Sequence, residues 1–483
     1  MSIRRYASYN LVAAVAPILV SFATVPLYLE AIGLERYGVL AICWVLVGYF
    51  GLFEFGLGPA TSQRIAALAD APANEKSQTI WCALLLSLGL GILGGCLVYV
   101  FGGPLLTAIR SIESSLADEL NRAIPWLAVL IPLTTSYGVL SGALQGSNRF
   151  KVMNLIGATG NVVVGVAPLL VAVLVGPQLP NLLETVVVGR GLTVAMLLMC
   201  CWRSVPMSVP ALPSWARIES LAVFGGWVTA TAIVVPILMG AEKLAIGWMA
   251  GATAVSIYMI PYNLISRLLV IPQSLASALF PRFALIPEHE VDATEYRALR
   301  SLSAILTPIL VAGLAALPPF LDLWVGANIG QQSWPIGTVL IAGIWFNCCS
   351  FIPHSRLQGG GRPDVVTKIS IGQLLPYLLA VYVAIRLAGP IGAAAVWSVR
   401  VAVEMFIFFA ATGQPQRLLS TVLPPGALVL ASAAAALLAP FPSAVGIATQ
   451  IVLLALAIGI AIIRLRKEFP SWRISPMDQV SPI

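Results

Sequence analysis

Three arginines lie near the middle of long apolar segments, where a charged side chain is least expected. They are Arg190 in the run 182–202, Arg267 in the run 253–280 and Arg400 in the run 391–411. A cation at the bilayer centre costs roughly 2.5–3.5 kcal/mol on insertion scales, so it persists where it faces water or an anion. A guanidinium binds two phosphate oxygens in one plane and stays protonated. The three arginines are therefore predicted to bind an anionic substrate.

The local sequence distinguishes the three arginines. A glycine on each side of Arg190 leaves space for a bulky anionic group, or allows close helix packing instead. Glu404 follows Arg400 by one helical turn, so the two charges can neutralise each other in a dry interior. Arg267 has no acidic residue within a turn. We expect Arg190 and Arg267 to contact the anion, and Arg400 to form a switchable pair with Glu404.

Three carboxylates are candidates for ion coupling: Glu404, Glu54 and Glu242. Transport driven by an ion gradient needs a carboxylate that exchanges a proton or binds sodium. Glu54 lies near the end of an apolar segment, so the alternative is that it caps or tethers the turn before Arg64. The two histidines and seven cysteines show no metal-ligand spacing. No metal or cofactor is expected.

The composition is that of a membrane protein. The chain has 483 residues and a mean hydropathy of +0.93. Only 10% of the residues are charged, against about a quarter in soluble proteins. Apolar stretches of ~20 residues suit a hydrocarbon core of ~30 Å. An all-α polytopic protein with about 14 transmembrane helices is predicted from the stretches 8–29, 38–57, 79–101, 123–144, 152–175, 181–202, 219–240, 252–280, 299–322, 334–354, 366–387, 389–411, 420–439 and 444–463.

The charge distribution predicts the orientation of the chain. With the N-terminus inside, 19 of the 27 Lys and Arg residues fall in inner loops and tails. The outer loops hold Arg36, Arg110, Arg122, Lys243 and Arg386. Because positive residues gather on the cytoplasmic side, both termini are predicted to be cytoplasmic. The net charge of +7 follows from this topology, and no nucleic-acid partner is expected.

A short motif occurs twice in the chain. Its copies are Leu144-Gln145-Gly146-x-x-Arg149 and Leu357-Gln358-Gly359-x-x-Arg362, each after an apolar segment. A weaker match, at the slightly longer interval from Gly33 to Gly251, also includes the pair Ala60/Ala278. The two matches together indicate an internal duplication, which places Arg190 and Arg400 in corresponding segments.

The duplication predicts how the chain is divided. We expect six-helix bundles at 1–217 and 218–412, followed by two additional helices and a cytoplasmic tail at 413–483. Because six is even, the two bundles share one orientation. Their pseudo-two-fold axis then runs along the membrane normal, with the substrate path between them.

Motifs of the common enzyme classes are missing from the sequence. It contains no Gly-x-Ser-x-Gly, no phosphate-binding loop and no metal-ligand cluster. Without a nucleotide site, this chain alone cannot drive transport with ATP. A membrane-embedded glycan polymerase or ligase is a less favoured alternative, because such an enzyme usually carries a large outer loop and the loops here are short.

Two groups of motifs carry a family resemblance. The first comprises Pro26-Leu-Tyr-Leu-Glu-Ala-Ile-Gly-Leu-Glu-Arg-Tyr-Gly38, Gly51-Leu-Phe-Glu-Phe-Gly-Leu-Gly-Pro-Ala60 and Arg64. The second comprises Gly240-Ala-Glu-Lys243, Pro261-Tyr262 and Leu279-Phe-Pro-Arg282. Together they resemble the polysaccharide or O-antigen (Wzx-type) flippases of the multidrug/oligosaccharidyl-lipid/polysaccharide exporter superfamily, over residues 8–412. Glu242 and Lys243 stand where that family usually has Asp and Arg.

The resemblance implies a fold and a function. The fold is two pseudo-symmetric six-helix bundles around a central cavity, plus two C-terminal helices. The function is to move an undecaprenyl-pyrophosphate-linked oligosaccharide repeat unit from the cytoplasmic to the outer leaflet of the bacterial inner membrane by ion-coupled alternating access. A polysaccharide polymerase and a chain-length regulator are the implied protein partners. The alternative is a multidrug/cation antiporter of the same superfamily, which would prefer an acidic cavity.

Overall fold

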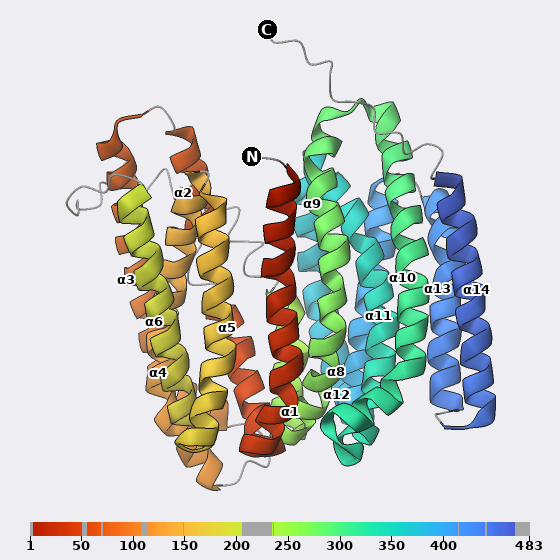
Figure 1. The fold of residues 1–483 in the computed structure, drawn as a ribbon, viewed down its shortest axis with the longest axis horizontal. Helices are drawn as coiled ribbons and strands as arrows, with labels where there is room; N and C mark the ends of the chain where they lie inside the picture. Colours follow the sequence, from red (N-terminus) through yellow and green to blue (C-terminus); the bar gives the residue numbers. More distant parts are fainter. Residues whose placement is uncertain are drawn as a thin grey trace. The chain divides into compact units, whose positions relative to one another are not determined.

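The computed structural model describes residues 3–50, 56–68, 71–107, 114–147, 149–204, 234, 236–413, 415–439 and 442–468. Every regular element in these ranges is a helix (Figure 1). Eleven of the described helices are long and apolar enough to cross a membrane. The prediction of an all-α polytopic membrane protein is therefore confirmed, while the predicted count of fourteen spans is not.

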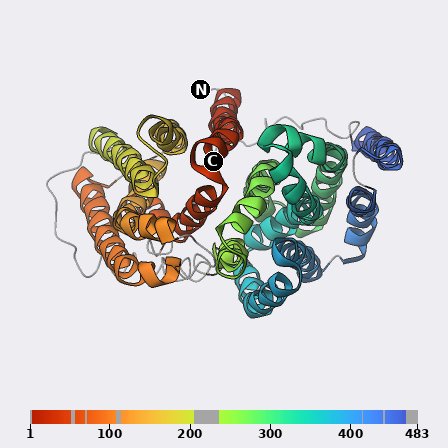
Figure 2. The same cartoon turned by 90° about the horizontal axis from the view of Figure 1, so that it is seen from below.

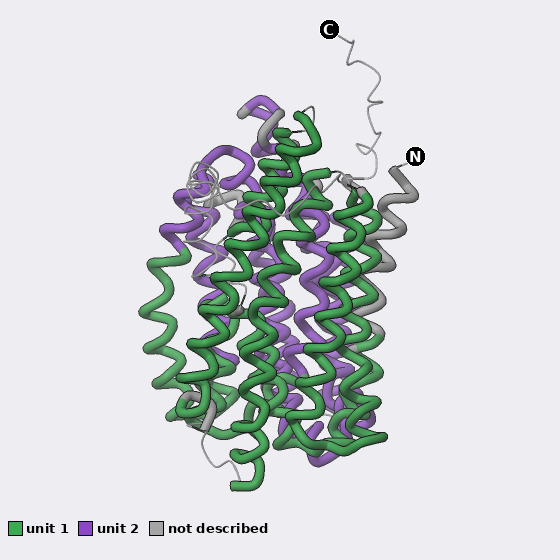
Figure 3. Tube along the Cα trace, turned by 90° about the vertical axis from the view of Figure 1, so that its left-hand side faces the viewer, with its two compact units in different colours: residues 1–260, 370–393 green, residues 261–369, 394–483 purple. Residues whose placement is uncertain are grey.

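The chain forms two compact units, which Figure 3 distinguishes by colour. One unit comprises residues 1–260 and 370–393, and the other comprises 261–369 and 394–483. The predicted boundary at 217/218 lies outside the described residues. The predicted bundles at 1–217 and 218–412 therefore stay predictions.

The helices of the first unit are α1 (Ile3–Phe50), α2 (Leu57–Ala67), α3 (Ala73–Thr107), α4 (Ser114–Gly146), α5 (Phe150–Leu174), α6 (Leu179–Ser204) and the helical residues 236–250. The helices of the second unit are η2 (Arg267–Leu269), α9 (Val270–Leu285), α10 (Glu288–Val325), α11 (Ala327–Gly359), α13 (Pro415–Leu438) and α14 (Ala444–Glu468). Two helices, α8 (Ala252–Ser266) and α12 (Pro363–Ala411), contribute residues to both units.

Each unit is built around one central helix. In the first unit α4 contacts α1, α2, α3, α5 and α6, and Figure 2 shows these helices end-on. In the second unit α11 contacts α9, α10 and α13. Both central helices carry a copy of the Leu-Gln-Gly motif at their C-terminal ends. A helix enclosed by its neighbours loses its contact with lipid, which explains the large buried share of both α4 and α11.

Two glycines join spans that the sequence predicts as separate helices. The predicted spans 8–29 and 38–57 both begin within α1, which bends at Gly33 (φ 79°, ψ 166°). Likewise, 366–387 and 389–411 both lie in α12, which bends at Gly389 (φ 60°, ψ −143°). A positive φ is strained for a residue with a Cβ atom, so glycine permits a sharp turn without a loop. The two bends thus reduce the number of separate helices by two, and the predicted span 219–240 lies largely outside the described residues.

The two copies of the motif adopt the same backbone geometry. The N–H group of Arg149 donates to the Leu144 carbonyl at 2.8 Å, and that of Arg362 donates to the Leu357 carbonyl at 2.8 Å. The weaker match has a structural counterpart too, because Gly33 and Gly251 both have positive φ, 79° and 91°.

Helix packing repeats as well. A Cβ atom added at Gly146 would overlap the carbonyl oxygen of Ser62, and one added at Gly359 would lie 2.7 Å from the carbonyl oxygen of Phe280. Gly146 and Gly359 are equivalent residues of the motif, and Ser62 and Phe280 stand at the interval of the weaker match. The α2–α4 contact of the first unit thus corresponds to the α9–α11 contact of the second. These contacts support the predicted internal duplication.

We expect Gly146→Ala and Gly359→Ala each to destabilise the protein by about 1–3 kcal/mol, because the added methyl group would push the two packed backbones apart. The measurement is the midpoint of thermal unfolding of the purified protein in detergent. Gly372→Ala is the matched control, since a Cβ atom at this helical position meets nothing within 4 Å. Equal midpoints for all three variants would contradict the repeated close contact.

Candidate site: a pocket beside Arg190

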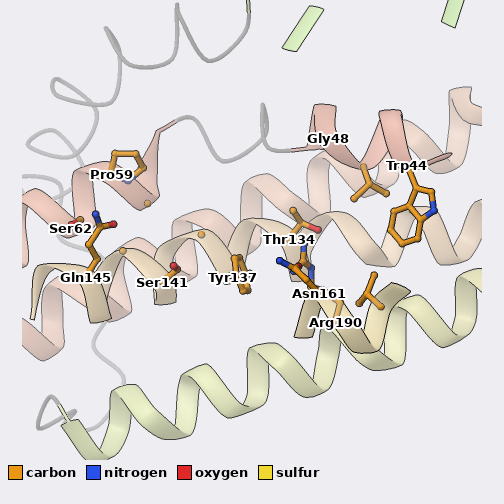
Figure 4. A pocket seen from close by; sticks show the side chains of 15 residues that line it. Trp44, Gly48, Pro59, Ser62, Thr134, Tyr137, Ser141, Gln145, Asn161 and Arg190 are labelled. Carbon is orange, nitrogen blue, oxygen red and sulfur yellow. The ribbon is translucent and has the colours of Figure 1, made fainter. Parts of the chain in front are cut away.

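A pocket of about 830 Å³ lies within the first unit, between α1, α2, α4, α5 and α6 (Figure 4). Ligand pockets in proteins typically enclose ~300–1,000 Å³. The polar side chains of its lining are Ser62, Thr134, Tyr137, Ser141, Gln145, Asn161 and Arg190. Arg190 is the one charged residue among the residues that the structure shows lining this pocket.

The helical period of α4 produces most of this lining. Thr134, Tyr137, Ser141 and Gln145 follow one another at three- and four-residue spacing, which places them on one face of the helix. The other side of α4 is apolar and packs into a buried cluster with residues of α2, α3 and α6. The amphipathic pattern of α4 thus corresponds to a polar face that lines the pocket and an apolar face that packs in the core.

Arg190 lies in α6 and reaches the pocket beside Tyr137. Its guanidinium carbon is 4.6 Å from the centre of the Tyr137 ring. Such a cation–π contact contributes about 0.5–2 kcal/mol, depending on desolvation. The structure gives the half-buried Arg190 no carboxylate partner within the described part of the chain. The ring covers one face of the guanidinium and leaves its N–H edge for an anion.

The two glycines beside Arg190 have different surroundings. A Cβ atom at Gly189 would lie 3.3 Å from Val163, so this glycine allows α5 and α6 to pack closely. A Cβ atom at Gly191 would meet nothing within 4 Å. Close packing therefore accounts for Gly189 alone.

Arg267 and Arg400 belong to the second unit. Arg267 begins the short 3₁₀ segment η2, and its buried Nε has no hydrogen-bond partner in the described residues. A 3₁₀ turn inside a span often marks a hinge. Arg400 instead donates to Glu404 at 3.3 Å, with side chains 10% and 15% exposed. The predicted Arg400–Glu404 pair is thus formed, whereas the meeting of all three arginines at one substrate stays a prediction.

The duplication sharpens the relation between Arg190 and Arg400. Gly176 precedes α6 and Gly389 precedes the last part of α12, at the same interval as the two motif copies, and both have positive φ. This interval relates Arg190 to Val403 rather than to Arg400. The two arginines occupy corresponding helices but are offset by nearly one turn, ~4.5 Å along the helix axis.

The three candidate coupling carboxylates have separate outcomes. Glu54 lies outside the described residues. Glu404 is paired with Arg400. Glu242 is fully buried, 0% exposed, in the helical residues 236–250. Its neighbour Lys243 is 3% exposed in the same helix, so the prediction that Lys243 belongs to an outer loop is wrong. The hydropathy pattern ends the predicted span 219–240 just before this pair, whereas the helix continues to residue 250.

Glu242 lies in a buried hydrogen-bonded network. Lys243 Nζ donates to one carboxylate oxygen at 2.7 Å, and the Tyr377 hydroxyl donates to the other at 2.9 Å. Tyr49 is adjacent, because a Cβ atom at Gly240 would lie 2.6 Å from its hydroxyl oxygen. The network joins the helix at 236–250 to α12. Glu242 and Lys243 are adjacent in the sequence, but Tyr377 lies 135 residues from Glu242, so its part in the network could not be predicted from spacing.

Two further ion pairs were not expected from the sequence. Arg36 on α1 binds both carboxylate oxygens of Glu119 on α4, at 2.7 and 3.2 Å, and Glu119 also accepts the Leu179 N–H. In the second unit Arg356 binds Asp292 at 2.8 Å and also contacts Glu295. Both pairs fasten the end of the central helix to a neighbouring helix, so we assign them a structural role.

Known proteins resemble this chain in sequence and in fold. A family model described as "Polysaccharide biosynthesis protein" matches residues 32–330. The chain belongs to this family. A curated relative, the "Putative O-antigen transporter" of Shigella flexneri, is 25% identical over 84% of this chain and 97% of its own length. This finding confirms the resemblance drawn from the motifs.

Solved structures of membrane transporters share the fold of this member of the polysaccharide biosynthesis family. The lipid II flippase MurJ in an inward closed conformation superposes with a TM-score of 0.71, at 12% identity, over 96% of this chain and 99% of its own. An inward-facing multidrug resistance MATE transporter superposes with a TM-score of 0.68, at 14% identity, over 82% and 94%. At such low identity the likeness shows the fold alone.

We expect Glu242→Ala to destabilise the protein by about 3–5 kcal/mol, since Lys243 would remain buried without its counter-ion. The double variant Glu242→Leu with Lys243→Met should be less destabilised than either single variant, because it removes both charges. Unfolding midpoints in detergent measure the difference. Asp364→Ala is the control: it breaks the exposed Asp364–Lys368 pair and should barely change the midpoint. A midpoint for Glu242→Ala like that of this control would refute a stabilising buried pair.

Proposed function

We propose that this protein is a flippase for a lipid-linked oligosaccharide. It moves an undecaprenyl-pyrophosphate-linked repeat unit from the cytoplasmic to the outer leaflet for surface polysaccharide synthesis. Membership of the polysaccharide biosynthesis family and the likeness to an O-antigen transporter support a transporter rather than an enzyme. The observation that carries the proposal is the pocket itself, in which Arg190 has no carboxylate partner in the described chain.

The pyrophosphate is the part of the cargo that opposes its passage across the bilayer. A pyrophosphate is anionic and strongly hydrated, so a bilayer excludes it unless a cation and hydrogen-bond donors replace its water. Arg190 supplies five N–H donors and a permanent charge in a partly desolvated pocket, where electrostatic attraction exceeds its value in water. The apolar tail of the cargo needs no such replacement and stays in the lipid.

The alternative of a multidrug/cation antiporter fits the pocket less well. A cationic drug would need a carboxylate to approach, but the described lining offers a cation and neutral groups. The Glu242 carboxylate is buried against Lys243, and Glu404 is paired with Arg400. Repulsion from Arg190 would therefore disfavour a cation in this pocket.

Alternating access requires an element with two arrangements, and the glycine bends are candidates. Gly33 and Gly389 interrupt α1 and α12 without a loop, so a small change in their backbone angles redirects a whole helix.

In the proposed cycle, protonation of Glu404 breaks its ion pair with Arg400. Ion coupling through this pair is consistent with the observed 3.3 Å contact, which is formed in the present state.

The proposed setting is the bacterial inner membrane, with both termini cytoplasmic. The excess of Lys and Arg in the predicted inner loops supports this orientation. A polysaccharide polymerase and a chain-length regulator would receive the repeat unit on the outer side, as proposed partners.

We expect Arg190→Ala to abolish glycan export with membrane insertion intact, and Arg190→Lys to retain part of it, because an ammonium keeps the charge but loses the bidentate geometry. Arg267→Ala should also abolish export. The measurement is surface polysaccharide made by cells that lack the native gene. Arg386→Ala is a matched control, since its guanidinium also lies over a tyrosine ring, that of Tyr382 at 5.0 Å, but outside the pocket. Normal export by both Arg190→Ala and Arg267→Ala would refute the anion site.

We expect Glu404→Gln to remove the dependence of export on a proton gradient, because an amide cannot exchange the proton that separates it from Arg400. The readout is flipping in vesicles with an imposed pH difference, compared with vesicles at equal pH. Asp364→Asn removes another carboxylate of α12, one in an exposed pair, and should leave the response unchanged. A pH response of Glu404→Gln equal to that of the wild type would exclude Glu404 from coupling.

A further inference from the structure

Four polar side chains in the pocket have unused hydrogen-bonding groups. Ser62, Ser141, Gln145 and Asn161 line it and make no side-chain hydrogen bond to the part of the chain that the structure describes. Thr134 differs, since its hydroxyl donates to the Leu130 carbonyl at 2.8 Å. Ser62 and Ser141 are partly exposed, and Gln145 and Asn161 are exposed, so their polar atoms are accessible to a ligand that offers donors and acceptors.

Ser62, Ser141 and Gln145 extend away from the arginine, whereas Asn161 lies beside it. Figure 4 shows Ser62 and Gln145 towards one end of the pocket, and Arg190 with Asn161 towards the other. From Thr134 to Gln145 the polar face of α4 rises ~16 Å. A pyrophosphate bound at Arg190 would occupy a small part of a pocket of about 830 Å³. The rest of the polar face is available to a second part of the same ligand.

The chemistry of this face selects that second part. Its side chains are hydroxyls and primary amides, which are neutral and both donate and accept hydrogen bonds. Trp44 adds an aromatic surface near the Arg190 end. A neutral partner rich in hydroxyl and amide groups matches these side chains, whereas an apolar chain would leave them unsatisfied and a second charge would find no counter-ion. A saccharide has this character.

The other half of the duplication shares this lining only in part. At the intervals established by the packing contacts, Ser62 corresponds to Phe280, Ser141 to His354 and Arg190 to Val403. His354 is engaged with the Phe408 ring, at a centroid distance of 5.5 Å. The polar face of α4 recurs on α11, where Asn347, Ser350 and Gln358 stand at the interval from Thr134, Tyr137 and Gln145. In the first unit this face is joined by Ser62 and Arg190, whose equivalents in the second half are apolar.

We propose that the α4 face formed by Ser141 and Gln145, with Ser62, is a saccharide subsite distinct from the phosphate site at Arg190. The proposal rests on the proposed flippase function. The cargo then lies along α4, with its pyrophosphate at Arg190 and its first sugars extending towards Ser62. The subsite recognises neutral hydroxyls and amides, and its residues lie in the first unit.

The test compares two probes on the full-length protein in lipid nanodiscs. One probe is the lipid-linked saccharide extracted from membranes of the source organism, and the other is undecaprenyl pyrophosphate without a sugar. Ser141→Ala with Gln145→Ala should weaken the saccharide probe about five- to tenfold or more, as expected for lost hydrogen bonds, and leave the bare lipid unchanged. Arg190→Ala should weaken both probes.

The duplication supplies a matched pair of variants. Ser62→Phe places the residue of the second half into the pocket and should selectively weaken the saccharide probe. Phe280→Ser makes the reverse change at an exposed position of the second half and should alter neither affinity. Thermal midpoints of all variants establish that they are folded.

The outcomes separate the two proposals. If Arg190→Ala weakens both probes while the subsite variants weaken neither, or weaken both equally, the saccharide subsite is overturned and the flippase function stands. If the folded wild-type protein binds neither probe, both proposals are overturned. Selective loss of the saccharide probe in the double variant and in Ser62→Phe supports the subsite.

Discussion

The hydrocarbon core of the membrane contains no water, and this constraint shapes every part of the molecule. Backbone groups are satisfied within helices, and a charge within a span needs a partner. Glu242 and Lys243 neutralise each other in a fully buried network, and Arg400 is paired with Glu404. Arg190 has an aromatic ring and an open pocket instead. The charges that the structure describes inside the spans thus include buried ion pairs and, at Arg190, a cation that faces a pocket.

The two halves of the duplication share one backbone arrangement, while some of their side chains differ. Close contacts between backbones persist at Gly146 and Gly359, because a side chain at either position would separate the packed helices. Side chains that face away from these contacts are free to differ, and Ser62 and Phe280 do. Packing thus preserves the fold of both halves, while individual lining residues differ: Ser62 corresponds to Phe280, and Arg190 corresponds to Val403.

Charge and shape in the pocket act on different parts of the proposed cargo. A guanidinium stacked on a ring has a defined orientation, so it can discriminate a planar pair of oxygens from a spherical anion. Hydroxyl and amide groups discriminate by hydrogen bonds, and a site built for hydrogen bonds rejects ligands that leave its groups unpaired. The contact between Arg190 and the anion would supply affinity, and hydrogen bonds from the neutral groups would supply selectivity. This division would allow a transporter to bind its cargo and still release it.

The sequence by itself determined the class of the protein, because hydropathy and charge respond directly to the membrane. The apolar segments, the duplication in the Leu-Gln-Gly motif and the exceptional position of Arg190 follow from residue types and spacing. Tertiary structure decided which charges are paired. Glu242 meets Tyr377 from a distant part of the chain, and Arg190 meets Tyr137 across two helices. Such contacts depend on how helices pack, which spacing along one chain does not encode. Glycine bends reduced the number of separate helices for a related reason: a turn at one positive-φ residue needs no loop.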